Sequence, residues 1–470
     1  MQDKLQEKML TQEEERDWSA AWLRIGQWLF LLLIAGCALT GGGHYLEFGP
    51  VTPRMILGAG VLICTVPLLW KERAFQIRNP IMWLTLAAVL WLVMEAVRGF
   101  VQGNNRLVLM TDIKGFAWLF LVPCAQVLVR SRKMLENCVK AMVIGASLQA
   151  VICIGINFYM LFAMPPHSTP EIITVLNYIN VYAHEVQWGA VDYGLWEAYR
   201  IFCSSSLFLA IGACVLFFEL MRSEKPWRTG AHLFLLVFAL LMTCTRSLFG
   251  AWLAGMAAVA VLVLLFYPEY RRPLWQRSLV TLGLGFVALE LLEVIFVQGY
   301  LEYAVARTFQ FDMYRYSILR LRRSSPETWD RIVYETQKTD PLRGETKEGI
   351  LDLFRANPAA GAGLGATAPT RDEPDEYFYL DMLARTGFVG TALYLSPIGY
   401  SIARFLLPKL DMLRQYREGV IILSTLAVLL VATYYNPWLN AVLGISWMAV
   451  VLAVVTVLKR EKEGNAAHES

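Results

Sequence analysis

The sequence predicts an all-α polytopic membrane protein with about twelve transmembrane helices and a long outer, periplasmic loop of short helices. Three observations lead to this fold class. Of the 470 residues, 56% are hydrophobic and only 17% are charged, against roughly 25% charged in soluble domains. Apolar runs of about 15–25 residues recur along the chain, as bilayer-spanning helices require. Lysine and arginine gather in alternate connections between these runs.

The apolar runs define twelve candidate spans. The first six lie at 25–40, 55–70, 80–97, 115–129, 139–163 and 201–221, and the second six at 231–244, 247–267, 278–297, 387–407, 420–434 and 439–458. A mixed-charge leader, 1–24, comes first and lacks the short basic start of a cleavable signal peptide. The expected organisation is therefore a leader (1–24), nine spans with an outer loop at 164–200 (25–297), a long extracytoplasmic loop (298–386), three spans (387–458) and a tail (459–470).

The positive charges indicate the orientation. The connections after the second, fourth, sixth, eighth and tenth spans are rich in lysine and arginine, and so is the tail. Because basic loops stay in the cytoplasm, both termini are expected there. The segment between the third and fourth spans is an exception, since it carries Arg98, Arg106 and Lys114 on the outer side.

Charge and cysteine content narrow the function classes. The net charge of +3 mainly records the basic loops, so no nucleic-acid partner is expected. The eight cysteines lie in or beside predicted spans, and their spacing indicates neither a disulfide framework nor a metal site. No metal or cofactor is predicted.

The long outer loop contains the most unusual sequence. Within "GETKEGILDLFRA", apolar residues at helical spacing predict an amphipathic helix packed on the membrane domain. The stretch "ANPAAGAGLGATAP" follows, with Gly361, Gly363 and Gly365. A nucleotide-binding loop would need a lysine after its last glycine, or a strand before and a helix after. The glycines are instead expected to permit a tight, close-packed turn.

The C-terminal half contains an ordered series of short motifs. Arg343 stands fourteen residues before Asn357-Pro358, the three glycines follow, and "EYFYLDMLARTGFVG" closes the pattern at Gly390. Upstream, "TCTRSLFGAWLAG" places Arg246 at an outer turn, and "YRIFCSSSLFLAIG" places Arg200 at the start of a span. Over roughly residues 199–407, this series resembles the bacterial O-antigen ligase and O-antigen (exopolysaccharide) polymerase superfamily.

The resemblance implies transfer of a glycan from an undecaprenyl-diphosphate-linked donor to a glycan or lipid-linked glycan acceptor, among membrane lipids. A chain-length regulator is a further candidate partner. Arg200, Arg246 and Arg343 would bind the diphosphate, because guanidinium groups stay charged and grip phosphate oxygens in pairs. Glu376 would be the catalytic general base. Transfer would be metal-independent and would invert the anomeric carbon.

The residue at position 376 separates two activities within this superfamily. Ligases of the family carry a histidine where this chain has Glu376, and all five histidines lie elsewhere. Polymerisation of lipid-linked repeat units is therefore favoured over ligation to lipid A-core. Two other interpretations stay open. A multi-span transporter would also place charges inside the membrane, and the arginines could equally interact with lipid headgroups.

Overall fold

The computed structural model describes residues 2–40, 51–71, 79–163, 189–193, 199–243, 245–296, 345–368, 377–406, 417–434 and 436–469. Helices make up almost all of these residues. In the first part of the chain they are α1 (Gln2–Leu39), α2 (Pro53–Lys71), α3 (Pro80–Gln102), α4 (Arg106–Ala117), η1 (Trp118–Phe120), α5 (Leu121–Leu128) and α6 (Arg132–Ala163). In the second part they are α8 (Leu207–Arg222), α9 (Pro226–Met242), α10 (Arg246–Phe266), α11 (Pro268–Phe296), an unlabelled helix at 345–356, α15 (Phe378–Leu406), α17 (Glu418–Thr433), η3 (Trp438–Asn440) and α18 (Val442–Glu469).

Six of the described helical segments are long and apolar enough to cross a membrane. They are Trp18–Leu39, Pro53–Lys71, Pro80–Gln102, Arg106–Leu128, Arg132–Ile156 and Ser247–Phe266. Three shorter apolar helices, Pro226–Met242, Glu418–Thr433 and Val442–Leu458, accompany them. These helices support a helical membrane protein, and each of the twelve apolar runs overlaps a described helix.

Helix α3 has one apolar face suited to lipid and another face buried against the protein. Leu90, Val93 and Val97 recur at helical spacing and are more than half exposed. The opposite face buries Leu92, Glu95 and Gly99, among others. An exposed face made of large aliphatic residues suits a hydrocarbon environment, whereas the buried face carries the polar groups. The buried face therefore has to find partners inside the protein.

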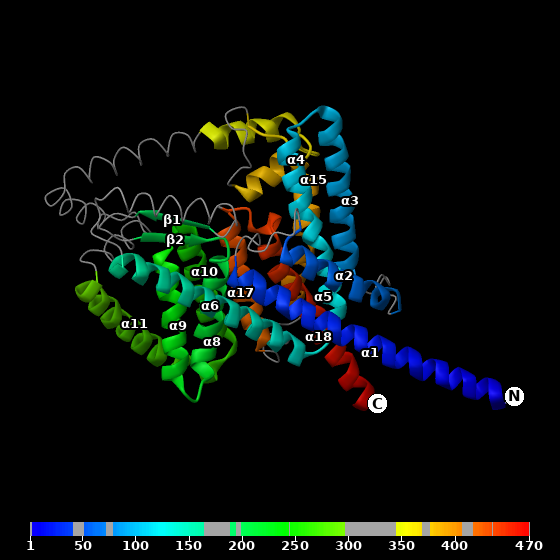
Figure 1. The fold of residues 1–470 in the computed structure, drawn as a ribbon, viewed down its shortest axis with the longest axis horizontal. Coiled ribbons are helices and arrows are strands. Elements are labelled where there is room, and N and C mark those ends of the chain that lie inside the picture. The colour runs from blue at the N-terminus through cyan, green and yellow to red at the C-terminus, as the bar shows by residue number, and fades with distance from the viewer. Residues whose placement is uncertain are drawn as a thin grey trace.

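The helices form two groups joined by a central set (Figure 1). Helices α3, α4 and α15 lie together on one side, where α3 packs along α15. Helices α8, α9, α10 and α11 gather on the other side, with α17 packed on α10. Between them, α1 packs against α2 and α6, and α18 packs against α5. The N-terminal end of α1 projects away from the remaining helices (Figure 1).

Several predicted boundaries are wrong. Helix α15 begins at Phe378 and not at residue 387, so the last residues of the predicted long loop are helical. Two further errors concern segments that carry arginines.

Residues 201–203, expected to begin a span, belong to strand β2 (Tyr199–Cys203), which pairs antiparallel with β1 (Gly189–Tyr193). The strand ends in a turn where Ser206 accepts a hydrogen bond from the Cys203 amide at 3.2 Å, and α8 begins only at Leu207. The aromatic and β-branched residues in "YRIFC" favour a strand, and the following serines favour a turn.

The second of these errors concerns the basic segment between the third and fourth spans. It is not a loop, because α3 continues to Gln102, turns at Gly103 with φ of 78°, and returns as α4 from Arg106. Asn105 caps α4 by accepting hydrogen bonds from the Leu107 and Val108 amides. The polar residues here are part of a helical hairpin, and their partners explain why they are tolerated.

Candidate functional site

The glycine-rich segment lies against the α3–α4 hairpin near its turn at Gly103. Gly361, Gly363 and Gly365 have φ values of 75°, 83° and 78°, a left-handed conformation that costs other residues about 1–2 kcal/mol each. A side chain at Gly363 would also overlap the backbone of Gly99 in α3. Alternate residues of the segment therefore have to be glycine for both conformational and steric reasons.

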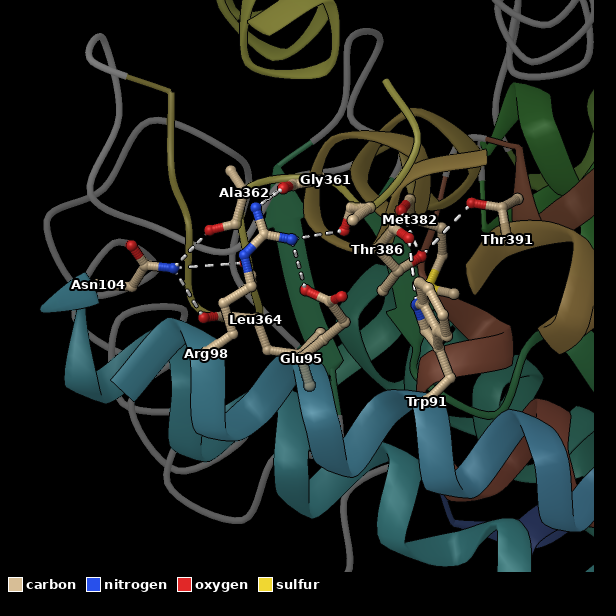
Figure 2. Close-up of polar contacts among 12 residues, drawn as sticks. Trp91, Glu95, Arg98, Asn104, Gly361, Ala362, Leu364, Met382, Thr386 and Thr391 are labelled. Atoms are coloured by element: carbon tan, nitrogen blue, oxygen red, sulfur yellow. Dashed lines mark hydrogen bonds and ion pairs between the residues drawn. The ribbon is translucent and has the colours of Figure 1, made fainter. Parts of the chain in front are cut away.

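The polar residues at the end of α3 hold this segment by its carbonyl oxygens. The Arg98 guanidinium donates to the carbonyls of Ala360 at 3.2 Å and Gly361 at 2.5 Å, and it pairs with Glu95 at 3.4 Å. The Asn104 amide donates to the carbonyls of residues 362, 363 and 364. Figure 2 shows both side chains directed from the hairpin toward the glycine segment. Arg98, an exception to the charge pattern of the loops, thus has a local structural role.

The glycine segment also joins the two halves of α15. Gly387 interrupts this helix with φ of 67° and ψ of −175°, which leaves backbone groups on each side without helical partners. The carbonyls of residues 384 and 385 accept from the Ala362 and Gly363 amides, at 2.7 and 2.9 Å. Beyond the kink, the amides of residues 388 and 389 donate to the carbonyls of residues 358 and 359. The segment and the kink therefore complete each other's hydrogen bonding.

A buried ion pair fixes the far end of the segment. The Arg385 guanidinium lies 3.0 Å from the Asp112 carboxylate, and their side chains are 7% and 1% exposed. The second Asp112 oxygen accepts from the Gly365 amide at 3.0 Å, and Arg385 Nε donates to the Ala366 carbonyl at 3.0 Å. Asn440, from η3, adds a 3.3 Å contact to Asp112. We call Glu95, Arg98, Asn104, Asp112 and Arg385 the clasp, since together they hold the glycine segment against α3, α4 and α15.

The structure describes the predicted transferase residues to different extents. Arg200 lies in β2, opposite Asp192 in the strand register, and Arg246 is the first residue of α10; only their backbones are described. Strand β2 packs against α9, whose C-terminal end leads into α10. The two arginines therefore lie on elements at the same end of this helix group. Arg343 and Glu376 lie outside the described residues.

Contacts through the end of α17 nevertheless connect the surroundings of Glu376 and Arg246. Tyr377, which follows Glu376, packs its ring edge-on against Tyr434, with centroids 6.5 Å apart. Two residues later, the Asn436 amide donates to the Ser247 hydroxyl at 3.2 Å, and Ser247 follows Arg246. The C-terminal end of α17 thus lies between residues adjacent to the predicted base and to a predicted phosphate ligand. We take this region, with the clasp beside it, as the candidate functional site.

Apolar packing and a hydrogen bond hold the chain on the two sides of Glu376. Before it, Ala368 is buried against Ile350 of the 345–356 helix and Ala384 of α15. After it, the Tyr379 hydroxyl donates to the Leu430 carbonyl at 2.8 Å. Because both flanks are anchored, a short segment carrying Glu376 has to start and end at defined points.

Among the described residues, no cluster of three or more histidine, cysteine, aspartate or glutamate side chains could hold a metal ion. The charged groups that the described part of the site offers are the guanidinium and carboxylate groups of the clasp. The pairing of Asp112 with Arg385 was missed in the sequence. Each of the two segments showed only a charged residue among mainly apolar neighbours, and nothing local indicated that the two residues would meet.

Comparison of the chain with protein-family models, curated proteins and solved structures finds no match.

Proposed function

We propose that this protein is a membrane glycan transferase that polymerises undecaprenyl-diphosphate-linked oligosaccharide repeat units on the outer side of a bacterial cytoplasmic membrane. The observation that carries the proposal is the contact route through the end of α17, from Tyr377 through Tyr434 and Asn436 to Ser247. It joins two segments that are about 130 residues apart in sequence and that each contain a residue suited to the chemistry. The ordered resemblance to O-antigen polymerases and ligases is the second support.

The proposed architecture has about twelve spans, with both termini in the cytoplasm and the site at the outer ends of the helices. The donor would approach sideways from the outer leaflet, so that its polyprenyl chain stays in lipid while its diphosphate meets protein at the boundary. The end of α17, the α3–α4 hairpin and the glycine segment would all lie at this level. The clasp would then maintain the outer loop in a fixed position above the bilayer.

The proposed chemistry is a single displacement at the anomeric carbon of the donor sugar. Glu376 removes the proton of an acceptor hydroxyl, the resulting oxygen forms the new glycosidic bond, and the bond to the lipid diphosphate breaks. The departing diphosphate gains negative charge, which Arg200, Arg246 and Arg343 would stabilise. By analogy with single oxyanion-hole donors, each is expected to contribute about 3 kcal/mol to the transition state.

The test uses the purified protein in nanodiscs with lipid-linked repeat units from its host, in the presence of EDTA. Products would be sized on gels and by mass spectrometry for the wild type, Arg246→Ala, Glu376→Gln and a control, Arg222→Ala. Arg222 lies at the other end of α8, where it pairs with Glu219 at 3.0 Å. A ladder of longer lipid-linked glycans in the wild type and the control, reduced at least 100-fold in both site variants, is expected.

The alternatives give different products. Transfer to an added lipid A-core acceptor without chain extension would identify a ligase and reject the polymerase. If folded protein with its authentic donor yields neither product, the transferase proposal fails. Movement of a solute across proteoliposome membranes would then favour a transporter.

A further inference from the structure

Two cysteines that are 50 residues apart in sequence meet at the base of the strand pair. Cys153 lies on α6, three residues before the end of its candidate span, and Cys203 is the last residue of β2. Their sulfur atoms are 3.4 Å apart, and both side chains are fully buried. The placement of Cys203 in a strand, rather than inside a span, brings it to the end of the helix group where Arg246 begins α10.

Neighbouring hydrogen bonds fix the positions of these two sulfur atoms relative to each other. Gln149 lies one turn before Cys153, so the two side chains share a face of α6. The Gln149 amide lies 3.3 Å from the Ser206 hydroxyl, which also accepts from the Cys203 backbone amide at 3.2 Å. Ser205 reaches the carbonyl of Leu39, the last residue of α1, at 3.4 Å. The turn after β2 is therefore fastened at several points, and one face of α6 meets both of its ends.

We propose that Cys153 and Cys203 form a disulfide bond when the protein is in its native membrane. The approach of the two sulfurs is the geometric basis, and disulfides persist where the environment is oxidising, as outside the bacterial cytoplasmic membrane. This setting rests on the orientation that accompanies the proposed function. The bond would tie β2, and so the backbone that carries Arg200 three residues earlier, to α6.

The bond forms during folding, before the two sulfur atoms are buried, by thiol–disulfide exchange with an oxidised dithiol protein or a small disulfide. The thiolate of one cysteine attacks the oxidant's disulfide, forms a mixed disulfide and releases one oxidant thiolate. The thiolate of the second cysteine then displaces the other oxidant sulfur. The two protein thiols lose two electrons and two protons, and the oxidant is reduced to two thiols.

The first measurement counts disulfide-bonded cysteines in cells that express the full chain. Cells are quenched with acid, free thiols are blocked with N-ethylmaleimide, and disulfides are reduced and labelled with a maleimide polymer that shifts the band on a gel. Most wild-type chains should carry two labels, in at least tenfold excess over unlabelled chains. Cys153→Ser and Cys203→Ser should each lose both labels. Cys214→Ser, a matched buried cysteine of α8 that contacts the Trp252 carbonyl at 3.7 Å, should keep them.

A second measurement makes the result independent of variant folding. Wild-type protein is digested without reduction, and mass spectrometry should find the peptide with Cys153 linked to the peptide with Cys203. Protein that is reduced while unfolded in denaturant, and then returned to detergent with oxidised glutathione, should give the same linked pair, because the thiols are accessible before folding buries them. Absence of the link from cells overturns the proposal, as does a link between other cysteines. A link that forms only in purified protein also overturns it and contradicts the proposed orientation.

The outcome is separable from that of the transferase assay. Glycan extension by protein that lacks the disulfide would reject the disulfide alone. A disulfide found in cells together with no glycan transfer would reject the transferase and leave the disulfide in place.

Discussion

Two groups of ion pairs differ in burial. The clasp lies near the C-terminal end of α17 and the start of α18, and a second charged cluster lies near the other ends of these two helices. The second cluster, which we call the Arg132 junction, joins the starts of α6 and α17 to the end of α18: Arg132 lies 3.7 Å from Glu418 and 2.9 Å from Glu461. These three side chains are 23–37% exposed. Asp112 and Arg385 are almost fully buried, and each also bonds to backbone.

The comparison teaches that similar ion pairs have different energetic roles. In a partly exposed pair, each charged group gives up contacts with water to gain its partner, so the pair contributes little to the free energy of unfolding. A buried pair repays its desolvation only when every remaining polar group is also bonded, and removing one partner leaves an unpaired buried charge. The clasp should therefore be sensitive to single changes, whereas the Arg132 junction should tolerate them. Four substitutions can break or sharpen this contrast, and each can be followed by the free energy of unfolding in mixed detergent micelles.

The largest effect is expected for Asp112→Ala. It leaves the Arg385 guanidinium buried without its carboxylate and removes the acceptor of the Gly365 amide, so the free energy of unfolding should fall by about 3–5 kcal/mol. Arg385→Ala should cost a similar amount, while the double variant should cost clearly less than the sum. Strict additivity of the two single effects would contradict the coupling that the structure shows.

The next effect is expected for Gly363→Ala. An alanine there has to adopt a positive φ and displaces the backbone of α3, which should lower the free energy of unfolding by roughly 1–3 kcal/mol. Gly250→Ala is the matched control, because Gly250 lies within α10 and an added Cβ meets nothing within 4 Å. That control should raise stability by about 0.5–1 kcal/mol. Equal responses at the two positions would argue against a specific role for the turn.

A smaller effect is expected for Arg98→Ala, which removes two hydrogen bonds from a charged donor to backbone carbonyls and the ion pair with the buried Glu95. The Glu95 carboxyl can take up a proton and so avoid remaining as a buried charge without a partner. Because the Arg98 side chain is 26% exposed, a loss of about 1.5 kcal/mol is expected, the lower end for charged hydrogen bonds. Arg106→Ala provides the comparison at the other side of the hairpin, since Arg106 lies over the Phe100 ring at 5.9 Å. Its loss should be no more than about 0.5–1 kcal/mol. A larger effect at Arg106 than at Arg98 would reverse the proposed ranking.

The smallest effect is expected for Arg132→Ala. A partly exposed pair is worth about 0–1 kcal/mol and weakens as salt is added. The difference between wild type and variant should therefore shrink further between low and high salt. A loss above about 3 kcal/mol would place the Arg132 junction in the same class as the clasp and remove the contrast between the two ends.

The sequence predicts the helical segments well because apolar runs record burial in lipid directly. It predicts their ends less well. The run from residue 106 to 114 contains three charged residues, so the turn of the α3–α4 hairpin was expected to be a longer loop. The partners that make those charges tolerable, such as Arg385 for Asp112, lie 273 positions away in sequence. No local pattern contains that information.

For the candidate site, too, the sequence predicts what depends on a single residue and misses what depends on contacts between distant residues. The three glycines of the outer segment were expected to permit a close-packed turn, and each of them has a positive φ, because a backbone requirement is visible at the residue itself. The residues that hold the turn, Arg98 and Asn104, were not recognised as its partners. The roles assigned to Arg200, Arg246, Arg343 and Glu376 stay predictions, since they depend on side chains that the structure does not describe.

The separation of Asp112 from Arg385 in sequence also sets a delay between their synthesis on the ribosome. At typical synthesis rates of about 5–20 residues per second, the 273 residues between them take about 14–55 s to appear. The α3–α4 hairpin enters the membrane long before its partner exists, and during that interval the Asp112 carboxylate has to be solvated by water or headgroups near the hairpin's turn. The clasp therefore cannot close before Arg385 has been synthesised, and a chain that stops earlier keeps the Asp112 carboxylate without its buried guanidinium.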